Sequence, residues 1–572
     1  MPTFIHTSIF DVPEELFSMI IDLLSPHDIT KLMATCKILY YKLEPFLWRH
    51  VTIGDHLPEK ESLLRNRKHI QTLDVGGKAK DIFDILGSHL PPEGPVSTLH
   101  PSIAAYIALP ATINLRKLLI PGSVFFCSRS VRKDTRTISH IIPVIRNSPN
   151  LMQLHIHTDL IKSYRDIILD TISNKLPLLR ILSVGGDSVS LKSGLEFLLT
   201  CFQHPRLEDL RCDFSFASTG NSKTFGRTLD SALSPLAPKR RKKSLSSTAP
   251  SGSIITAIKL PHFNEKMASI VVRVLYIVRD FCPHLERFEI PNLHFDYDAE
   301  RDCPSEGWFN HLQHITYPNS YYRVPIYGPS PNFVNSLLEG CSKGAGIKTL
   351  DLPDLRDGEN ASKEANLLGT LAKFYSRTLE EINIDHYVSL TSRDIQDILK
   401  TSEKLTKFWI PTTTLVGTLS GDWVCLNLKV LSLVFDASTE QGNGQGGKQS
   451  QVLAATHVFE QIGRLTKLET LRLGWTGVTC SCFSNVGPEH PSRLHPSVEL
   501  ETLAGLRNLR HFYMFTDCWQ HVGQAEVEFM HGHWPCLEKI TVQRLGPGYP
   551  IERPHWEWLK EQRPQLRLDG VY

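Results

Sequence analysis

Short motifs rich in glycine, cysteine or histidine are the stretches of this sequence whose residue types suit chemistry. Residues 442–449, GNGQGGKQ, satisfy both G-x-x-x-x-G-K and G-x-G-x-x-G, patterns in which backbone N–H groups cradle phosphates. However, Gln449 stands where a hydroxyl would meet a metal ion, and the residues DASTEQ separate the preceding strand-like run from the first glycine. This spacing spoils a tight cradle. We interpret the stretch as a flexible connection, with nucleotide binding as the alternative.

Metal-ligand residue types also occur, but not in the patterns that hold a metal. Cys480 with Cys482, and His531 with His533, lack a second pair at zinc spacing. The acidic residues of 296–302 do not follow the calcium-loop pattern. The sequence contains no H-E-x-x-H, no G-x-S-x-G and no arguable catalytic triad. We therefore expect a binding protein rather than an enzyme, with no catalytic residue, metal or cofactor.

The composition is that of a folded soluble protein, with 41% hydrophobic and 21% charged residues. Its net charge of +2 gives no global field that would attract nucleic acid or a membrane. The longest apolar stretch begins at Ile270 and contains Arg273, so it falls short of the roughly 20 apolar residues of a spanning helix. The N-terminus lacks a secretory pattern, and the 12 cysteines are scattered as reduced thiols. These features predict an intracellular protein of the nucleus, the cytoplasm or both.

The N-terminal segment predicts three short helices. Pro13 suits a first helical turn, and Ser25 followed by Pro26 and Asp28 reads as a new helix start. A third helical piece begins at residue 37 and is expected to end before Pro45. The first helix has an apolar face at helical spacing, made of Leu16, Met19, Ile20, Leu23 and Leu24. Three short helices share little interior, so several of these side chains must pack against the rest of the chain or against another protein.

This segment resembles the F-box family. The resemblance is carried by Val12-Pro13, Glu15-Leu16, Ile20, Leu23-Leu24, Pro26, Asp28-Ile29, Leu32, Cys36-Lys37 and Leu47-Trp48-Arg49. Two positions depart from the family pattern, since Val12 replaces a leucine and Leu39 replaces a tryptophan, but both stay apolar. The resemblance implies docking onto the adaptor subunit of an SCF-type ubiquitin ligase and, through it, onto a cullin. The implied adaptor-binding residues are Val12, Pro13, Leu16, Ile20, Leu24, Leu32, Cys36, Leu47 and Trp48. The alternative is a generic helical hairpin of the main fold.

A short apolar phrase, of the type L-x-x-L-x-L, recurs after this segment. It appears fourteen times, as in IKTLDL at Ile347 and LETLRL at Leu468, with irregular spacing. The phrase resembles the strand segment of leucine-rich repeats, in which alternate residues point into a shared core. The expected α/β fold is therefore a three-helix F-box over 8–52, then an irregular leucine-rich-repeat-like solenoid (a horseshoe with parallel strands) over 60–572. An ordinary α/β domain with leucine-rich strands is the alternative.

One long gap between repeats contains a polar insertion. Residues 218–253 are rich in serine, threonine, glycine and proline, which predicts a disordered loop within the solenoid. The basic run inside it suits a nuclear import receptor and consists of Lys239, Arg240, Arg241, Lys242 and Lys243. A solvated charge run is the alternative. Nucleic-acid binding is not expected, because no aromatic residues interleave with the basic ones.

The stacked repeats would present their outward strand residues on one concave face. We expect target contacts from Asp351, Asn383, Asp385, Trp409, Arg472 and Tyr513, because aromatic and arginine side chains dominate interface hot spots. The same register places further residues outward, namely His155, His157, Arg211, Asp213, Arg287, Glu289, Glu381, His511, Lys539 and Gln543. Cover by neighbouring loops is the alternative for Trp409 and Tyr513.

Together these features predict a substrate-recognition subunit of an SCF-type E3 ubiquitin ligase. Its F-box would hold the adaptor, and its repeats would hold an unknown protein target, with no chemistry of its own. The alternative is a non-degradative scaffold that holds the adaptor outside a ligase. A third hypothesis is an enzyme or nucleotide-binding protein that uses the loop from Gly442 to Lys448.

Overall fold

The computed structural model divides the chain into two compact units, Met1–Ile255 and Thr256–Tyr572. The residues that it describes are 12–53, 60–75, 114–120, 135–217, 253–263, 268–290, 309–317, 331–352, 367–384, 392–415, 421–436, 456–476, 500–515, 523–543 and 554–569. Among these residues no helix is both long and apolar enough to cross a bilayer.

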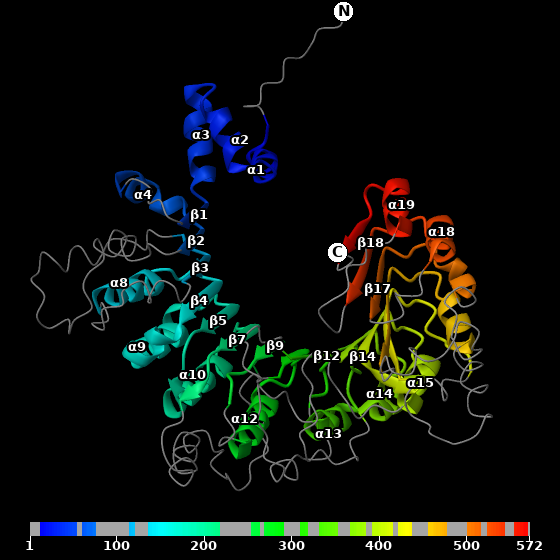
Figure 1. The fold of residues 1–572 in the computed structure, drawn as a ribbon. Helices are drawn as coiled ribbons and strands as arrows, with labels where there is room; N and C mark the ends of the chain where they lie inside the picture. The colour runs from blue at the N-terminus through cyan, green and yellow to red at the C-terminus, as the bar shows by residue number, and fades with distance from the viewer. Residues whose placement is uncertain are drawn as a thin grey trace, which may run out of the picture. The chain divides into compact units, whose positions relative to one another are not determined.

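The first unit is built on one parallel sheet. Its strands pair in the order β1 (His50–Ile53), β2 (Thr72–Val75), β3 (Lys117–Leu119), β4 (Gln153–His157), β5 (Ile181–Gly185) and β7 (Asp209–Asp213). A separate short pair is β6 (Val189–Ser190) with β8 (Phe216–Ala217). The helices α4 (Lys60–Asn66), α8 (Thr135–Arg146), α9 (Thr158–Asp170) and α10 (Leu191–Phe202) lie on one side of the sheet (Figure 1).

The second unit repeats this plan over more strands. They pair in parallel from β9 to β19, as β9 (Ala257–Lys259), β10 (Arg287–Glu289), β11 (His314–Thr316), β12 (Thr349–Leu352), β13 (Glu381–Ile384), β14 (Lys407–Leu415), β15 (Val430–Asp436), β16 (Thr470–Thr476), β17 (His511–Phe515), β18 (Lys539–Gln543) and β19 (Arg567–Asp569). One face carries α12 (Ala268–Phe281), α13 (Pro331–Cys341), α14 (Leu367–Tyr375), α15 (Ser392–Thr401), α18 (Gln524–His533) and α19 (Pro554–Gln562) (Figure 1). A further helix covers 456–463. We call the opposite face of the β9–β19 sheet the helix-free face.

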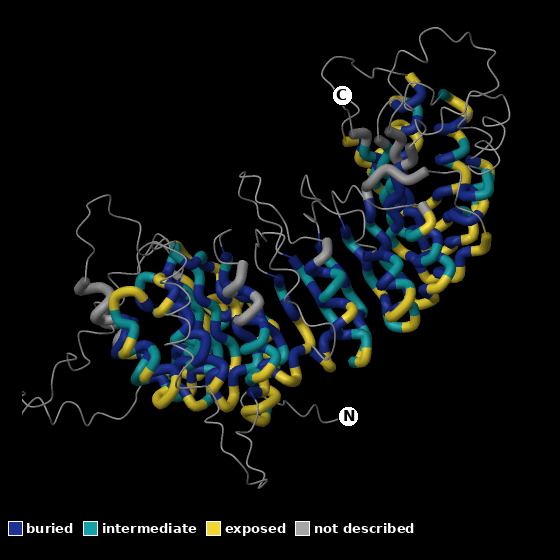
Figure 2. The backbone as a smooth tube through the Cα atoms, turned by 90° about the horizontal axis from the view of Figure 1, so that it is seen from below, coloured by how far each residue is buried: buried dark blue, intermediate teal, exposed yellow. Residues whose placement is uncertain are grey.

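Alternation within each strand explains why these phrases stack. In β12, Leu350 and Leu352 are buried beneath the helices, whereas Thr349 and Asp351 are half-buried on the other face. Figure 2 shows the buried positions running along the strands of each unit. All fourteen predicted phrases form strands of this kind, so each unit is a leucine-rich-repeat-like α/β solenoid segment. Strands β1 and β9 were not predicted, although β9 carries the same phrase in Ile255, Ile258 and Leu260, all of them buried.

A backbone ladder at the entrance to the strands fixes their register. The carbonyl of Lys348 accepts the N–H groups of both Glu380 (2.8 Å) and Glu381 (2.9 Å) of the next repeat. The carbonyl of Glu380 in turn accepts those of Thr406 (2.7 Å) and Lys407 (3.2 Å). The same arrangement, one carbonyl that accepts two backbone N–H groups of the next repeat, recurs from repeat to repeat in both units. Because every repeat holds the next by its backbone, irregular connections do not shift the strands.

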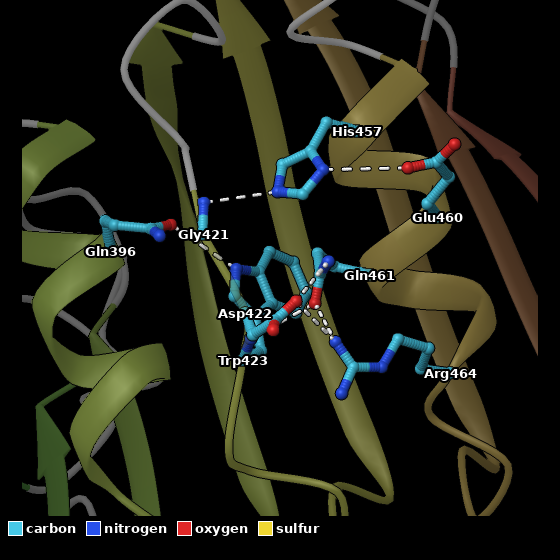
Figure 3. Close-up of polar contacts among 8 residues, drawn as sticks. All are labelled: Gln396, Gly421, Asp422, Trp423, His457, Glu460, Gln461 and Arg464. Carbon is cyan, nitrogen blue, oxygen red and sulfur yellow. Dashed lines mark hydrogen bonds and ion pairs between the residues drawn. The ribbon is translucent and has the colours of Figure 1, made fainter.

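Trp423 links two helices of the second unit. The described residues between β14 and β15, 421–429, are not helical, and Trp423 lies in the core at 2% exposure. Its indole N–H donates to Gln396 of α15 at 3.3 Å, and its backbone N–H donates to Gln461 of the 456–463 helix at 3.1 Å (Figure 3). Trp423 therefore bridges α15 and the 456–463 helix.

The N-terminal segment forms α1 (Glu14–Asp22), α2 (Pro26–Met33) and α3 (Lys37–Leu47). Ser25 caps α2 by accepting the backbone N–H of Asp28 at 3.2 Å, as predicted. The predicted end of the third helix was wrong, because α3 continues through Pro45. A proline so close to the helix end removes only one hydrogen bond, which the last turn tolerates.

A small core joins the three helices and differs from the predicted apolar stripe. Its buried members are Phe17, Ile21, Ile29, Met33, Leu39 and Leu43. Arg49, just before β1, ties this core to the first strand, because its guanidinium lies 2.9 Å from the Asp22 carboxylate and 3.9 Å over the Phe46 ring. Most of the predicted stripe on α1 consequently faces away from the core.

Candidate functional site

Large apolar side chains gather on the outside of the three N-terminal helices. Leu23 is 86% exposed and Met19 is 64% exposed, values unusual for such residues in a folded chain. We call this set the N-terminal apolar surface, and its members are Leu16, Met19, Ile20, Leu23, Ile38, Tyr40 and Tyr41. Elsewhere in the part of the chain that the structure describes, exposed large apolar residues are single or paired: Ile254, Phe374, Val424 and Leu426. Leu16, Met19, Ile20 and Leu23 recur at i, i+3, i+4 and i+7 and so share one face of the first helix, and an exposed apolar face of this kind is typical of a protein-interaction site.

The predicted adaptor-binding residues divide between this surface and its support. Leu16 and Ile20 belong to the surface, and Pro13 is exposed beside them. A second group is only partly buried and packs against the helical core, namely Val12, Leu24, Leu32 and Leu47. Trp48 is half-buried and ends α3.

Cys36 has a structural contact of its own. Its sulfur accepts the backbone N–H of Leu39 at 3.5 Å and so caps α3, while the residue stays exposed. The predicted site set omitted Ile38, Tyr40 and Tyr41. Their signal in the sequence was the i, i+4 spacing of the buried Leu39 and Leu43, which leaves Ile38 before them and Tyr40 and Tyr41 between them on other faces of α3.

The predicted target-binding residues lie in one row across the helix-free face. The strand register aligns Asp351 with Asn383, Asn383 with Trp409, and Arg472 with Tyr513. All five are half-buried on the side opposite the helices. Asp385 lies outside the described residues. The row therefore aligns side chains that are far apart in the sequence, since its ends, Asp351 and Tyr513, are 162 residues apart.

The centre of this row is a stacked pair. The Arg472 guanidinium carbon lies 4.8 Å from the centroid of the Trp409 ring, within cation–π range. Between them in the register is Ser432 of β15, which is fully buried although it points to the helix-free face. Beside the pair, the Asn383 amide donates to the Asp351 carboxylate at 2.6 Å. Ser432 was not among the predicted site residues.

A bulge in β14 follows directly after Trp409. The register advances from Trp409 opposite Ser432 to Thr413 opposite Val434, so β14 has extra residues at this point. Pro411, which cannot donate to a ladder, lies within the bulge. Bulges re-aim neighbouring side chains, which accounts for the Trp409 ring reaching across β15 to Arg472.

The first unit has a polar pair on the corresponding face. His155 of β4 and Ser183 of β5 are register neighbours, and the histidine Nδ1 lies 2.8 Å from the serine Oγ. Burial lowers the pKa of His155, so its ring is neutral at pH 7. His157 was predicted to face outward, and this was wrong. It is buried, because α9 begins at the next residue and His157 caps it by accepting the N–H of Asp159 at 3.3 Å.

No group of three or more His, Cys, Asp or Glu side chains suited to a metal occurs among the described residues. His531 instead accepts a bond from the Arg563 guanidinium at 3.2 Å, and His533 lies 3.1 Å from the Phe529 carbonyl. Burial raises the pKa of the Cys341 and Cys425 thiols to about 12, so neither is a thiolate at neutral pH. The glycine-rich stretch 442–449, Cys480 with Cys482, the acidic residues of 296–302 and the basic run 239–243 lie outside the described residues.

Comparisons with known proteins identify leucine-rich-repeat structures and nothing more specific. No family model matches the chain, and no curated protein matches it. It is similar to a leucine-rich repeat-containing protein of Legionella pneumophila, with 10% identity over 73% of this chain and 93% of that one, at a TM-score of 0.23. A leucine-rich-repeat protein of Leptospira interrogans matches with 11% identity over 82% of this chain and 98% of that one, at a TM-score of 0.29. The architecture assigned above is defined by the chain's own parallel strands and buried alternation.

Proposed function

We propose that this protein is the substrate-recognition subunit of an SCF-type ubiquitin ligase, with α1–α3 as an F-box that binds the adaptor. The N-terminal apolar surface carries this proposal. Seven large apolar side chains stay exposed on α1, its C-terminal end and α3, while a separate core of six residues already holds α1, α2 and α3 together. Burying them against a partner would release about 25 cal/mol for each Å² of apolar surface. A helical hairpin serving only its own fold has no reason to keep them exposed.

The row on the helix-free face is the proposed target-binding surface. It presents aromatic, amide and charged side chains on rigid strands, which suits recognition of a protein. Binding of adaptor and target by one chain would act by positioning, since it raises the effective concentration of the target near the ligase. The reacting cysteine would belong to another protein of the ligase.

A non-degradative scaffold that holds the adaptor without a cullin is the alternative. The same apolar surface would serve it, so composition of the complex decides between the two. Recovery of a cullin together with the adaptor favours the ligase, whereas adaptor without cullin favours the scaffold.

The experiment that tests the proposal changes the exposed surface and leaves the core intact. Met19→Glu with Leu23→Glu places charges on two side chains that make few contacts within the chain, so stability should change by less than about 1 kcal/mol. Adaptor capture by the purified full-length chain should be lost, because a buried unpaired charge abolishes a hot spot. Leu426→Glu, at an exposed leucine of the second unit, is the matched control and should capture adaptor normally. Normal capture by the double variant would refute adaptor docking through α1.

We also propose that the basic run from Lys239 to Lys243 directs nuclear import. Its support is the sequence alone, five consecutive basic residues within a polar stretch. Replacing the five with alanine in a fluorescently tagged full-length chain should move it from nucleus to cytoplasm. An unchanged distribution would leave the run as a solvated charge cluster.

A further inference from the structure

Trp409 and Arg472 form a closed clasp over Ser432. They stand on β14 and β16, one strand on either side of β15, and their stacked side chains meet above it. Ser432 consequently has 0% exposure even though its strand position faces away from the helices. We call these three residues the Trp–Arg clasp.

The Ser432 hydroxyl has no hydrogen-bond partner within the described part of the chain. A buried hydroxyl without a partner costs about 1–3 kcal/mol of stability. An alanine would fit the same space without that cost. In the strand register Ser432 stands between Trp409 and Arg472, so its residue lies between an indole and a guanidinium.

The charge of the helix-free face changes sign beside the clasp. Among side chains that the structure describes on this face of β14–β17, Lys407 and Arg472 are basic and none is acidic. The acidic residues Asp351 and Glu381 lie on β12 and β13 instead. A ligand that follows the row would therefore meet negative protein charge at β12–β13 and positive charge at β14–β17.

We propose that the Trp–Arg clasp is a subsite for one anionic side chain, a carboxylate or a phosphate, in an extended segment of the target protein. This inference rests on the target-binding role proposed above and names its chemistry. The anion would bind the Arg472 guanidinium, and displacement of the Trp409 ring would let the Ser432 hydroxyl donate to the same group. Asp351 and Glu381 would accept a basic or amide residue of the same segment.

The strand spacing predicts how far apart those two target residues lie. Neighbouring strands are about 4.8 Å apart, so β12 and β16 are separated by about 19 Å across the face. An extended chain covers roughly 3.3 Å per residue, which places the basic or amide residue about six positions from the anionic one.

The test uses the full-length chain and a library of fluorescein-labelled peptides in which one central position is fixed as Asp, Glu, phosphoserine, Gln or Lys. Peptides fixed as Asp, Glu or phosphoserine should bind at least ten-fold more tightly than those fixed as Gln or Lys. Comparing the affinity of the Asp and Glu peptides with that of the phosphoserine peptide shows whether the subsite prefers a carboxylate or a phosphate. Arg472→Gln should abolish this preference, whereas Arg510→Gln, at an exposed arginine just before β17, should keep it.

Ser432→Ala separates a binding role from a structural one. It should weaken binding of the preferred peptide about ten- to a hundred-fold, the value of one hydrogen bond to a charged group, while stability stays equal or rises. Ser402→Ala removes another fully buried, unpartnered hydroxyl away from the row and should leave binding unchanged. Peptide binding without charge preference, no peptide binding at all, or unaltered affinity in Ser432→Ala would each overturn the inference. Adaptor capture by the same variants tests the proposed adaptor binding independently of target binding.

Discussion

Trp423 is predicted to hold α15 and the 456–463 helix together in the second unit. Replacing it with alanine removes a side chain that is 2% exposed and leaves a cavity between α15 and the 456–463 helix. Buried tryptophan-to-alanine changes cost about 3–5 kcal/mol. The backbone bond from Trp423 to Gln461 stays available, so the loss is one of packing and of the indole bond to Gln396.

The indole contribution can be isolated with a smaller change. Trp423→Phe keeps most of the ring but removes the N–H that donates to Gln396 at 3.3 Å. Gln396 is itself buried, so its amide oxygen would lose a partner at a cost of about 1–3 kcal/mol. Combining Trp423→Phe with Gln396→Leu should cost less than the sum of the two single changes, because the broken pair is counted only once.

Urea unfolding followed by circular dichroism measures these differences in the free energy of unfolding. Val424→Ala is the matched control. Val424 is the next residue in the sequence and its side chain is 37% exposed, so this substitution should change the free energy of unfolding by less than about 0.5 kcal/mol. A cost below about 1 kcal/mol for Trp423→Ala would show that this tryptophan does not hold the two helices together.

Further predictions concern single positions. Ser25→Ala should destabilise the N-terminal helices by about 1 kcal/mol in thermal unfolding, because Asp28 loses its capped N–H, and Ser25→Asp should restore the loss. Gly186→Ala should reduce stability by at least about 2 kcal/mol in urea, because Gly186 has a φ of 134° and an added Cβ would lie 2.4 Å from His157 Nε2. Burial lowers the pKa of His204, so its contribution to stability is present above about pH 6.5 and is lost as pH falls toward the folded pKa. Urea titrations at pH 7.5 and 5.5 should show a smaller loss of stability for His204→Gln than for the natural chain.

The repeated phrase predicted strands because the residues that define it are the ones that the fold buries. Leu350 and Leu352 face the helices and are buried there, and burial requires apolar side chains, so the sequence pattern follows the buried positions of the strand. Strand β9 was missed although Ile255, Ile258 and Leu260 follow the phrase and are buried, because it directly follows the polar insertion that was assigned as a loop. Strand β1 was missed because its residues, His50–Ile53, directly follow the third N-terminal helix and were assigned with that segment.

The N-terminal helices show where periodicity is insufficient. On α1, Leu16, Ile20 and Leu23 share one apolar face, while Phe17 and Ile21 share another. Both spacings fit a helix, and only the packing of α2 and α3 decides that Phe17 and Ile21 enter the core. The sequence therefore predicted an apolar surplus correctly but could not say which residues would remain outside.

The buried hydroxyl of Ser432 was beyond sequence reasoning for a related physical reason. Its burial comes from Trp409 and Arg472, which belong to the strands on either side, and from the bulge that turns the Trp409 ring. A serine at an outward strand position is unremarkable by itself. Only the register of three strands reveals that it is covered.

Reconstitution with purified proteins tests the central proposal most directly. The full-length chain, the SCF adaptor and a cullin would be mixed and separated by size-exclusion chromatography with light scattering. The account predicts one complex that contains all three, and loss of both partners when Met19→Glu and Leu23→Glu are introduced. A complex of chain and adaptor from which cullin is excluded would favour the scaffold, and failure of the natural chain to bind adaptor would contradict the account.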